Sequence, residues 1–178
     1  MKSSFVALFA AAVLPFGLAA CGGAELAETD GYDLAKGNAG DEPLAFNPAA
    51  LKVATTVVGH PYLVDVEGTG TSSGMHWTLT YWGDIKGWAT VKISSTGAAT
   101  LVAHGHMIDS QMPASNIQLD KVKVTVAQLA TIAAKAGLTG KCTHLELTQV
   151  VGSNPNPHWA VEYGKKQILI DATTGNQE

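Results

Sequence analysis

The feature that most constrains the fold is a short phrase that occurs twice. The chain reads HWTLTYWG at 76–83 and HWAVEYGK at 158–165, eighty-two residues later. In both copies a His-Trp pair is followed by alternating apolar residues and a Tyr. Alternation with a period of two indicates a β-strand with one buried face. The chain is therefore expected to build two similar strands, each turning a Trp and a Tyr toward a core.

The residues around the two phrases extend the similarity. At a constant offset of 82, positions 63–81 align with 145–163 without a gap. The first copy then has four additional residues, after which VKISSTG at 91–97 matches ILIDATTG at 168–175. Matches of this length at one offset predict an internal repeat.

A candidate helix precedes each copy. The segment 47–59 begins with Asn47 and Pro48, which are favourable at a helix N-cap and first turn. The segment 125–137 has a stronger helical pattern, a capping Thr at its start and Gly137 at its end. The predicted fold class is α+β, a tandem duplication of a helix and an antiparallel strand unit, with repeats at 44–110 and 111–178. The strands would form two small sheets or one longer sheet, with the helices on one face.

The second copy resembles the C-terminal part of PepSY-type domains, which are small α+β modules of bacterial envelopes. The matching residues are Trp159, Val161, Ile168, Ile170, Asp171, Thr174 and Gly175. The first copy follows the pattern loosely, with Ser94 in the place of Asp171. The resemblance implies a binding or inhibitory module without catalytic residues.

The N-terminal residues indicate export. Lys2 precedes an apolar stretch from Phe5 to Ala20, which is too short for a transmembrane helix and ends in small residues. The ending Leu-Ala-Ala-Cys at 18–21 resembles the lipobox of bacterial lipoproteins. The resemblance implies a signal peptide at 1–20, cleavage before Cys21 and acylation of this Cys. The protein is then expected in the cell envelope, held to a membrane by its acyl chains. Because Gly22 rather than Asp follows the Cys, the outer membrane is favoured.

Charge is distributed unevenly along the chain. Residues 22–43 hold six acidic residues and one Lys, which together with Cys21 predicts a flexible acidic tether over 21–43. The remaining residues, 44–178, hold nine acidic residues and nine lysines. The chain has no arginine and no basic run, so nucleic-acid binding is not expected.

The repeated phrase also supplies a hypothetical binding site. Because His76-Trp77 and His158-Trp159 are equivalent in the repeat, they could form a symmetric pair of contacts for a partner. The alternative is structural: each His lies at a strand end, and each Trp packs in the core.

Histidines elsewhere suggest a metal site. His104 and His106 are two residues apart, so on a strand they point the same way and could bind zinc or copper. A third ligand would have to come from elsewhere, such as His60 or His144. The alternative is an exposed strand that happens to carry two histidines. No other cofactor is expected.

Sequence patterns for catalysis are missing. The chain has no G-x-S-x-G, S-x-x-K or H-E-x-x-H motif, and Cys142, the only Cys besides Cys21, reads as a buried structural thiol. The protein is therefore expected not to be an enzyme. The predicted function is binding of a protein or peptide in the envelope, including inhibition or modulation of a peptidase. The alternatives are a structural or assembly lipoprotein of the outer membrane and a zinc or copper binding protein.

Overall fold

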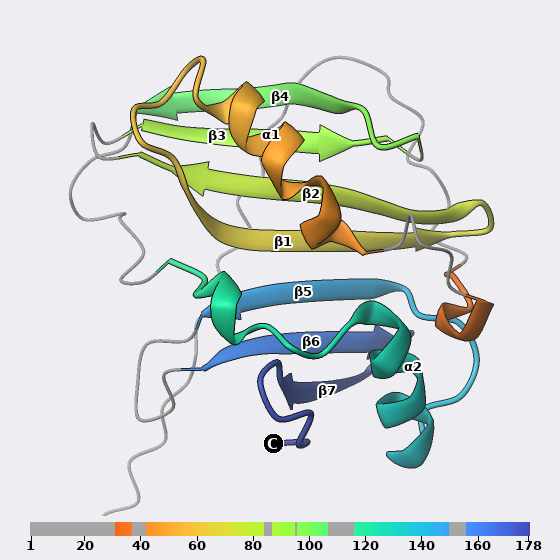
Figure 1. Ribbon diagram of the computed structural model, residues 1–178. Helices are drawn as coiled ribbons and strands as arrows, with labels where there is room; N and C mark the ends of the chain where they lie inside the picture. The colour runs from red at the N-terminus through yellow and green to blue at the C-terminus, as the bar shows by residue number, and fades with distance from the viewer. Residues whose placement is uncertain (1–30, 37–41, 84–86, 95, 107–115, 150–155) are drawn as a thin grey trace, which may run out of the picture.

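In the part of the chain that the structure describes, seven strands form one antiparallel sheet (Figure 1). The computed structural model describes residues 31–36, 42–83, 87–94, 96–106, 116–149 and 156–178. The strand order across the sheet is β4-β3-β2-β1-β5-β6-β7. The strands are β1 (Tyr62–Thr71), β2 (Gly74–Trp82), β3 (Gly87–Ile93), β4 (Ala99–His106), β5 (His144–Gln149), β6 (Pro157–Tyr163) and β7 (Lys166–Asp171). The fold is of α+β type, with one long sheet rather than two small ones.

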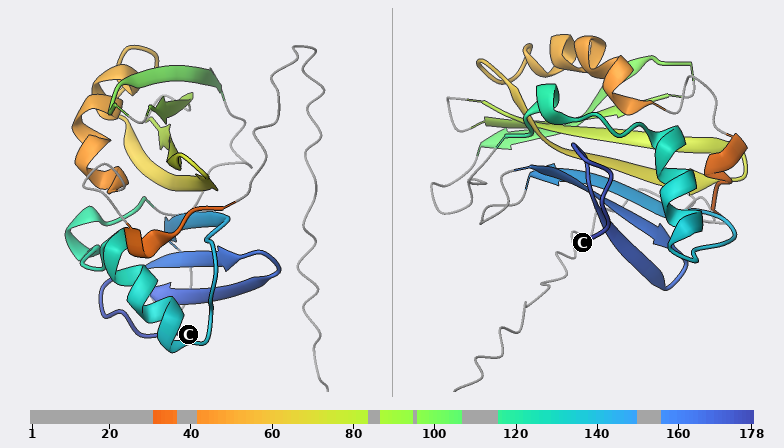
Figure 2. Two further views of the ribbon diagram at one scale, coloured as in Figure 1. Left: turned by 90° about the vertical axis from the view of Figure 1, so that its right-hand side faces the viewer. Right: turned by 60° about the horizontal axis from the view of Figure 1, so that its bottom comes forward.

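Two α-helices, α1 (Asn47–Ala54) and α2 (Val126–Lys135), lie on the same face of the sheet (Figure 2). α2 begins and ends as its sequence predicts. The Thr125 side chain accepts a hydrogen bond from the Gln128 N–H, and the Gln128 side chain accepts one from the Thr125 N–H. Gly137 follows the helix with a φ of 79°, a conformation that glycine adopts easily.

α1 differs from the prediction in its length and its cap. The helix ends at Ala54 instead of Gly59, because β-branched residues fill the following turn. Asn47 lies inside the helix, and its Oδ1 accepts a 2.7 Å hydrogen bond from the Tyr81 hydroxyl. This Asn therefore connects α1 to β2 instead of capping the helix. Among the residues that the structure describes, three short 3₁₀-helices lie in the connections: η1 (Leu34–Lys36), η3 (Pro43–Phe46) and η5 (Leu119–Lys121).

The Trp residues of the repeated phrase meet in the core between the sheet and the helices. Trp77 and Trp159 are each 1% exposed, and their rings make an edge-to-face contact at a centroid distance of 6.4 Å. The Trp159 Nε1–H donates to the Val124 carbonyl at 3.2 Å. The Trp77 ring lies over Gly68 of β1, where a Cβ atom would have no room. The two phrases thus contribute to one core that both halves of the chain share.

The strand ladders show where the ungapped alignment of the two copies fails. Trp77 is opposite Gly68 of β1, whereas Trp159 is opposite Leu147 of β5. Gly68 and Trp77 are nine positions apart, whereas Leu147 and Trp159 are twelve positions apart. The offset of 82 therefore relates β2 to β6 but does not relate β1 to β5. The order of a helix followed by three strands occurs twice, with β4 as an additional edge strand. Duplication of a PepSY-like unit stays a prediction.

In the described residues, the C-terminal part of the predicted tether over 21–43 contacts the domain. Tyr32 forms a two-hydrogen-bond bridge with Cys142, with both N···O distances 2.8 Å. Leu34 is only 2% exposed and packs into the core beside α2. Pro43 is also buried, and a Glu42 carboxylate oxygen accepts a 3.4 Å hydrogen bond from the Ala127 N–H. The composition of the segment did not indicate this contact, because its few apolar residues stand among six acidic ones. No helix in the described ranges is long and apolar enough to cross a membrane.

Replacing Leu34 by Ala tests whether residues 31–36 belong to the folded domain. We expect Leu34→Ala to lower the free energy of unfolding by about 2–5 kcal/mol, because it leaves a cavity in a packed core. The neighbouring Ala35 is exposed, so Ala35→Ser should change the free energy by less than about 0.5 kcal/mol. Urea denaturation of the unlipidated chain measures both values. Equal stabilities of the two variants would show that this segment is not part of the fold.

Candidate functional site

The face of the sheet opposite the helices carries polar side chains in rows across the strands. One row joins His76 of β2, Thr69 of β1, His144 of β5 and Glu162 of β6, each directly opposite the next. Strand alternation produces this row, because cross-strand partners share a face and neighbours such as Trp77, Leu145 and Val161 are buried on the other face. The row draws on both halves of the chain and crosses the centre of the sheet.

His76 is brought close to His144 rather than to His158. Both His76 and His144 are cross-strand partners of Thr69, so their Cα atoms lie two strand spacings, about 10 Å, apart. Sequence reasoning missed this pair, because the register between β1 and β5 joins residues more than 70 positions apart. The repeat pointed to His158 instead.

Two shallow hollows lie along this row. One, of about 380 Å³, is lined by His76, Lys92, Ser94, Thr100 and Val102 from β2, β3 and β4 and the residue after β3. The other, of about 660 Å³, is lined by Thr69, Thr143, His144, Glu162 and Gly164. The first hollow offers several hydrogen-bond donors, including an ammonium group, and no carboxylate. Its chemistry suits a carboxylate or another acceptor-rich group.

His158 is buried in a polar cluster on the same face of the sheet as this row, toward the opposite end of β6 from Glu162. Its side chain is 5% exposed, and its Nδ1 lies 2.9 Å from Glu178 Oε2. The neighbouring Asp171 accepts hydrogen bonds at 2.8 Å from the N–H groups of Thr173 and Thr174, which stabilises the Thr-Gly turn as its sequence suggests.

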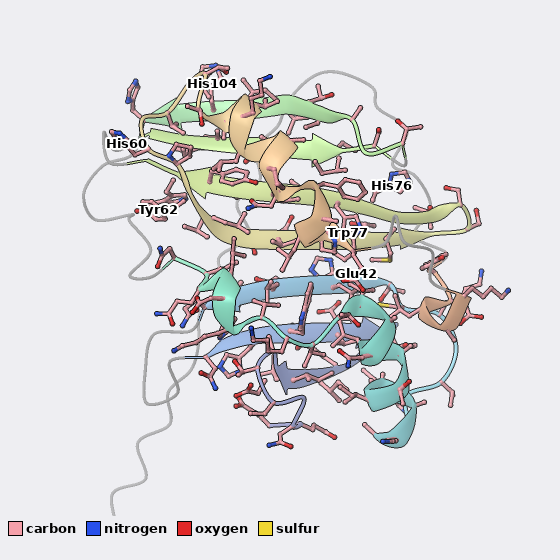
Figure 3. The ribbon with its side chains drawn as sticks, in the orientation of Figure 1. Glu42, His60, Tyr62, His76, Trp77 and His104 are labelled. Carbon is pink, nitrogen blue, oxygen red and sulfur yellow. The ribbon has the colours of Figure 1, made fainter. Side chains whose placement is uncertain are left out.

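The four predicted binding residues therefore separate into two groups. His76, labelled in Figure 3, is partly exposed beside a hollow. Trp77, His158 and Trp159 are buried, so none of them presents its side chain to a partner on the surface. Trp77 and Trp159 have the packing role that the sequence analysis gave as the alternative, and His158 lies near the start of β6.

Three carboxylates meet at the centre of the polar face. Glu67 of β1 is directly opposite Glu146 of β5, and Asp65 lies on the same face two residues before Glu67. Burial, followed by repulsion from Glu67 and Glu146, raises the pKa of Asp65 from 3.8 to about 7. Burial also raises the pKa of Glu146. The Asp65 Oδ1 atom is buried without a hydrogen-bond partner, so ionisation of this carboxyl is costly.

The proposed metal ligands are not gathered into a cluster. β4 has a bulge at Val102. Beyond it, His104 and His106 are exposed and point to the same side of the strand as each other, as predicted. In the described ranges no group of three or more His, Cys, Asp or Glu side chains is placed to hold a metal ion. His76 lies near the start of β2, at the other end of the sheet from His60 and His104 (Figure 3).

Cys142 has the surroundings of a structural thiol. It is fully buried, and its Sγ–H donates to the His144 carbonyl at 3.4 Å. Burial raises the pKa of this thiol to about 12. A nucleophilic Cys needs a thiolate, which this environment disfavours at neutral pH.

Comparison with known proteins shows a relative in fold alone. No protein-family model and no curated protein sequence matches the chain. A crystal structure of a protein from Clostridium difficile 630, provisionally described as a lipoprotein, matches with a TM-score of 0.63 and 15% sequence identity. The match covers 82% of this chain and 95% of the other. At this identity the likeness establishes a shared fold, and the resemblance to PepSY-type domains stays a prediction.

The raised pKa of Asp65 makes stability depend on pH in a definite direction. Between about pH 4 and 7 the folded state retains a proton on this carboxyl that the unfolded state loses, so stability should fall as pH rises. Asp65→Asn removes the titrating group. We expect the variant to be more stable than the wild type by about 1–3 kcal/mol at pH 8, with the difference disappearing near pH 4.

Urea denaturation at several pH values measures this difference. Thr80→Val, opposite Asp65 on β2, is a control that leaves the carboxyl in place and should retain the wild-type pH profile. A wild-type profile in Asp65→Asn would contradict the assignment.

Proposed function

We propose that this chain is a lipid-anchored protein of the bacterial cell envelope, and that its domain binds an extended peptide segment without catalysing a reaction. The anchor is Cys21, which follows an export signal in a lipobox-like sequence. The C. difficile protein of the same fold is itself provisionally described as a lipoprotein, which supports this part of the proposal.

The observation that carries the binding role is the outer edge of β4. β4 is the last strand of the sheet on its side, so the backbone groups on its outer edge have no strand beside them in the described residues. Edge strands are commonly protected by charged side chains, proline or a bulge. The eight residues of β4 include no Asp, Glu, Lys, Arg or Pro, and the strand has a bulge at Val102. An extended peptide can bind such an edge by adding a further strand.

Side chains beside β4 suggest which peptides would bind. Val102, the additional residue at a bulge in β4, is 54% exposed and lines the same hollow as Lys92 and His76. A peptide strand next to β4 would direct every second side chain toward this face. An apolar side chain could contact Val102, and an acidic one could reach Lys92. The preferred segment is therefore extended, apolar in part, and carries a carboxylate.

A non-catalytic role is consistent with the surroundings of Cys142 and with the sequence motifs. The Cys142 thiol is buried with a raised pKa, and no sequence motif for an activated nucleophile is present. An inhibitor or modulator of a peptidase and an assembly factor of the outer membrane would both use such a peptide site. The identity of the bound partner would distinguish these two roles.

Acylation of Cys21 can be tested directly in the source cell. Labelled palmitate should be incorporated into the wild-type protein and be absent from Cys21→Ala, because the thiol is the attachment point. Cys142→Ala is the control and should be labelled like the wild type. Equal labelling of wild type and Cys21→Ala would remove the anchor from this proposal.

Peptide binding at β4 can be tested with peptides selected from a random library on the immobilised chain. Val102→Glu removes the apolar contact and places a carboxylate beside Lys92, where it repels the carboxylate of the peptide, so it should weaken binding at least tenfold, which is about 1.4 kcal/mol. Leu169→Glu is the matched control, because Leu169 is 43% exposed on β7, the strand at the opposite edge. It should bind the peptides like the wild type.

Hydrogen exchange gives an independent readout of the same proposal. The amides of β4 should exchange more slowly in the peptide complex, because an added strand pairs with the free edge. Unchanged binding by Val102→Glu, together with unchanged exchange in β4, would place the peptide elsewhere.

A further inference from the structure

Lysines gather where the folded domain connects to the anchor. The first described residue, Gly31, lies so close to Lys141 that a Cβ on the glycine would clash with the Lys141 Cβ atom. Lys36 follows in η1, and Lys135 at the end of α2 lines a hollow together with Leu34 and Ala35. These three lysines therefore surround the point at which the chain enters the fold.

Two further lysines come from the turn between β6 and β7. The Gly164 N–H donates to Thr143 Oγ1 at 3.3 Å, so this turn lies beside the segment that holds Lys141. Lys165 and Lys166 follow Gly164 and are exposed. We define the anchor-end lysine cluster as Lys36, Lys135, Lys141, Lys165 and Lys166.

The charge of this end differs in sign from that of the remaining described surface. Near the five lysines lie the carboxylates of Asp33, which pairs with Lys36 at 3.8 Å, and Glu162. The other described residues contain four lysines and seven carboxylate side chains. Counting lysines minus carboxylates, the net charge is therefore +3 at the anchor end (5 − 2) and −3 among the other described residues (4 − 7). The composition of the whole chain conceals this asymmetry.

The length of the connection keeps this end near the membrane. Ten residue steps separate Cys21 from Gly31, and a chain of this length spans at most about 36 Å even when fully extended. The sequence analysis had allowed twice as many residues for the tether. With residues 31–36 docked on the domain, the anchor-end lysines are held within reach of the lipid headgroups.

We infer that the anchor-end lysine cluster binds the surface of a membrane containing anionic phospholipids and so orients the domain on it. The inference rests on the proposed acylation of Cys21 for its geometry. Each lysine near an anionic surface contributes a favourable interaction that salt weakens. Glu25, Glu28 and Asp30 in the connection oppose this attraction, and the chain used to test it retains them. β4 lies five strand spacings from β6, about 24 Å across the sheet, and so is separated from the lysines of the β6–β7 turn.

The test uses the chain from residue 21 onward with Cys21→Ser, so that no acyl chain contributes. Flotation with vesicles of phosphatidylcholine, with or without phosphatidylglycerol, measures its partitioning. We expect binding only to the anionic vesicles, strong at about 0.01 M salt and weaker at about 0.15 M salt. Equal partitioning into both kinds of vesicle would overturn the inference.

Two variants of equal charge locate the interaction. Replacing Lys141, Lys165 and Lys166 by Gln should lower the partition coefficient about 100-fold, or about fivefold for each charge. The control replaces Lys52, Lys121 and Lys123 by Gln and should lower it less than about threefold. Equal losses in the two variants would show that net charge alone matters and would overturn the inference. Unchanged urea midpoints in both variants verify that they are folded.

Failure of the lysine cluster and failure of the anchor give different results. Palmitate labelling reports on Cys21 alone, and vesicle flotation of the Cys21→Ser chain reports on the lysines alone. An unlabelled wild type whose Cys21→Ser chain binds anionic vesicles would retain the lysine surface and remove the acyl anchor. A labelled wild type whose Cys21→Ser chain binds no vesicle would do the reverse.

Discussion

The ladder between β1 and β5 is the interaction on which the rest of the structure depends. It joins the two halves of the chain into one sheet and sets the positions of β2 and β6 on either side. On the helix side this placement brings Trp77 and Trp159 into an edge-to-face contact in a common core. Neither half could bury its Trp as well alone, because each ring is partly covered by the other half. The two halves of the chain therefore share one core.

The same ladder places like charges side by side on the polar face. Placing Glu67 opposite Glu146 repels like charges across neighbouring strands, which is unfavourable in a sheet. The raised pKa of Asp65 is a consequence of burial and, to a smaller extent, of repulsion from Glu67 and Glu146. The ladder also places His76 and His144 on either side of Thr69. The centre of this face is acidic, whereas Lys92 and His76 line a hollow near β4. A bound carboxylate would be attracted to the second region and repelled from the first.

The proposed peptide site and the proposed membrane surface occupy different parts of the domain. The peptide would bind at β4, and the lysines gather around the start of β5 and the turn before β7. In the proposed arrangement, the short connection between Cys21 and Gly31 would hold the lysine surface near the lipid and leave β4 accessible. The packing of Leu34 on the domain shortens this connection.

Local patterns in the sequence determined the elements, because strand alternation, the Thr125 capping box and the Asp171 turn involve residues close together in the chain. They also determined which tryptophans are buried and that the N-terminus resembles a lipoprotein signal. The tertiary structure decided which strands became neighbours, and therefore that His76 lies near His144 and that His158 is buried. It also decided that Tyr32 and Leu34, which belong to the acidic segment, pack onto the domain. These outcomes depend on register and packing between distant segments, where a shift of one residue reverses the face of every side chain.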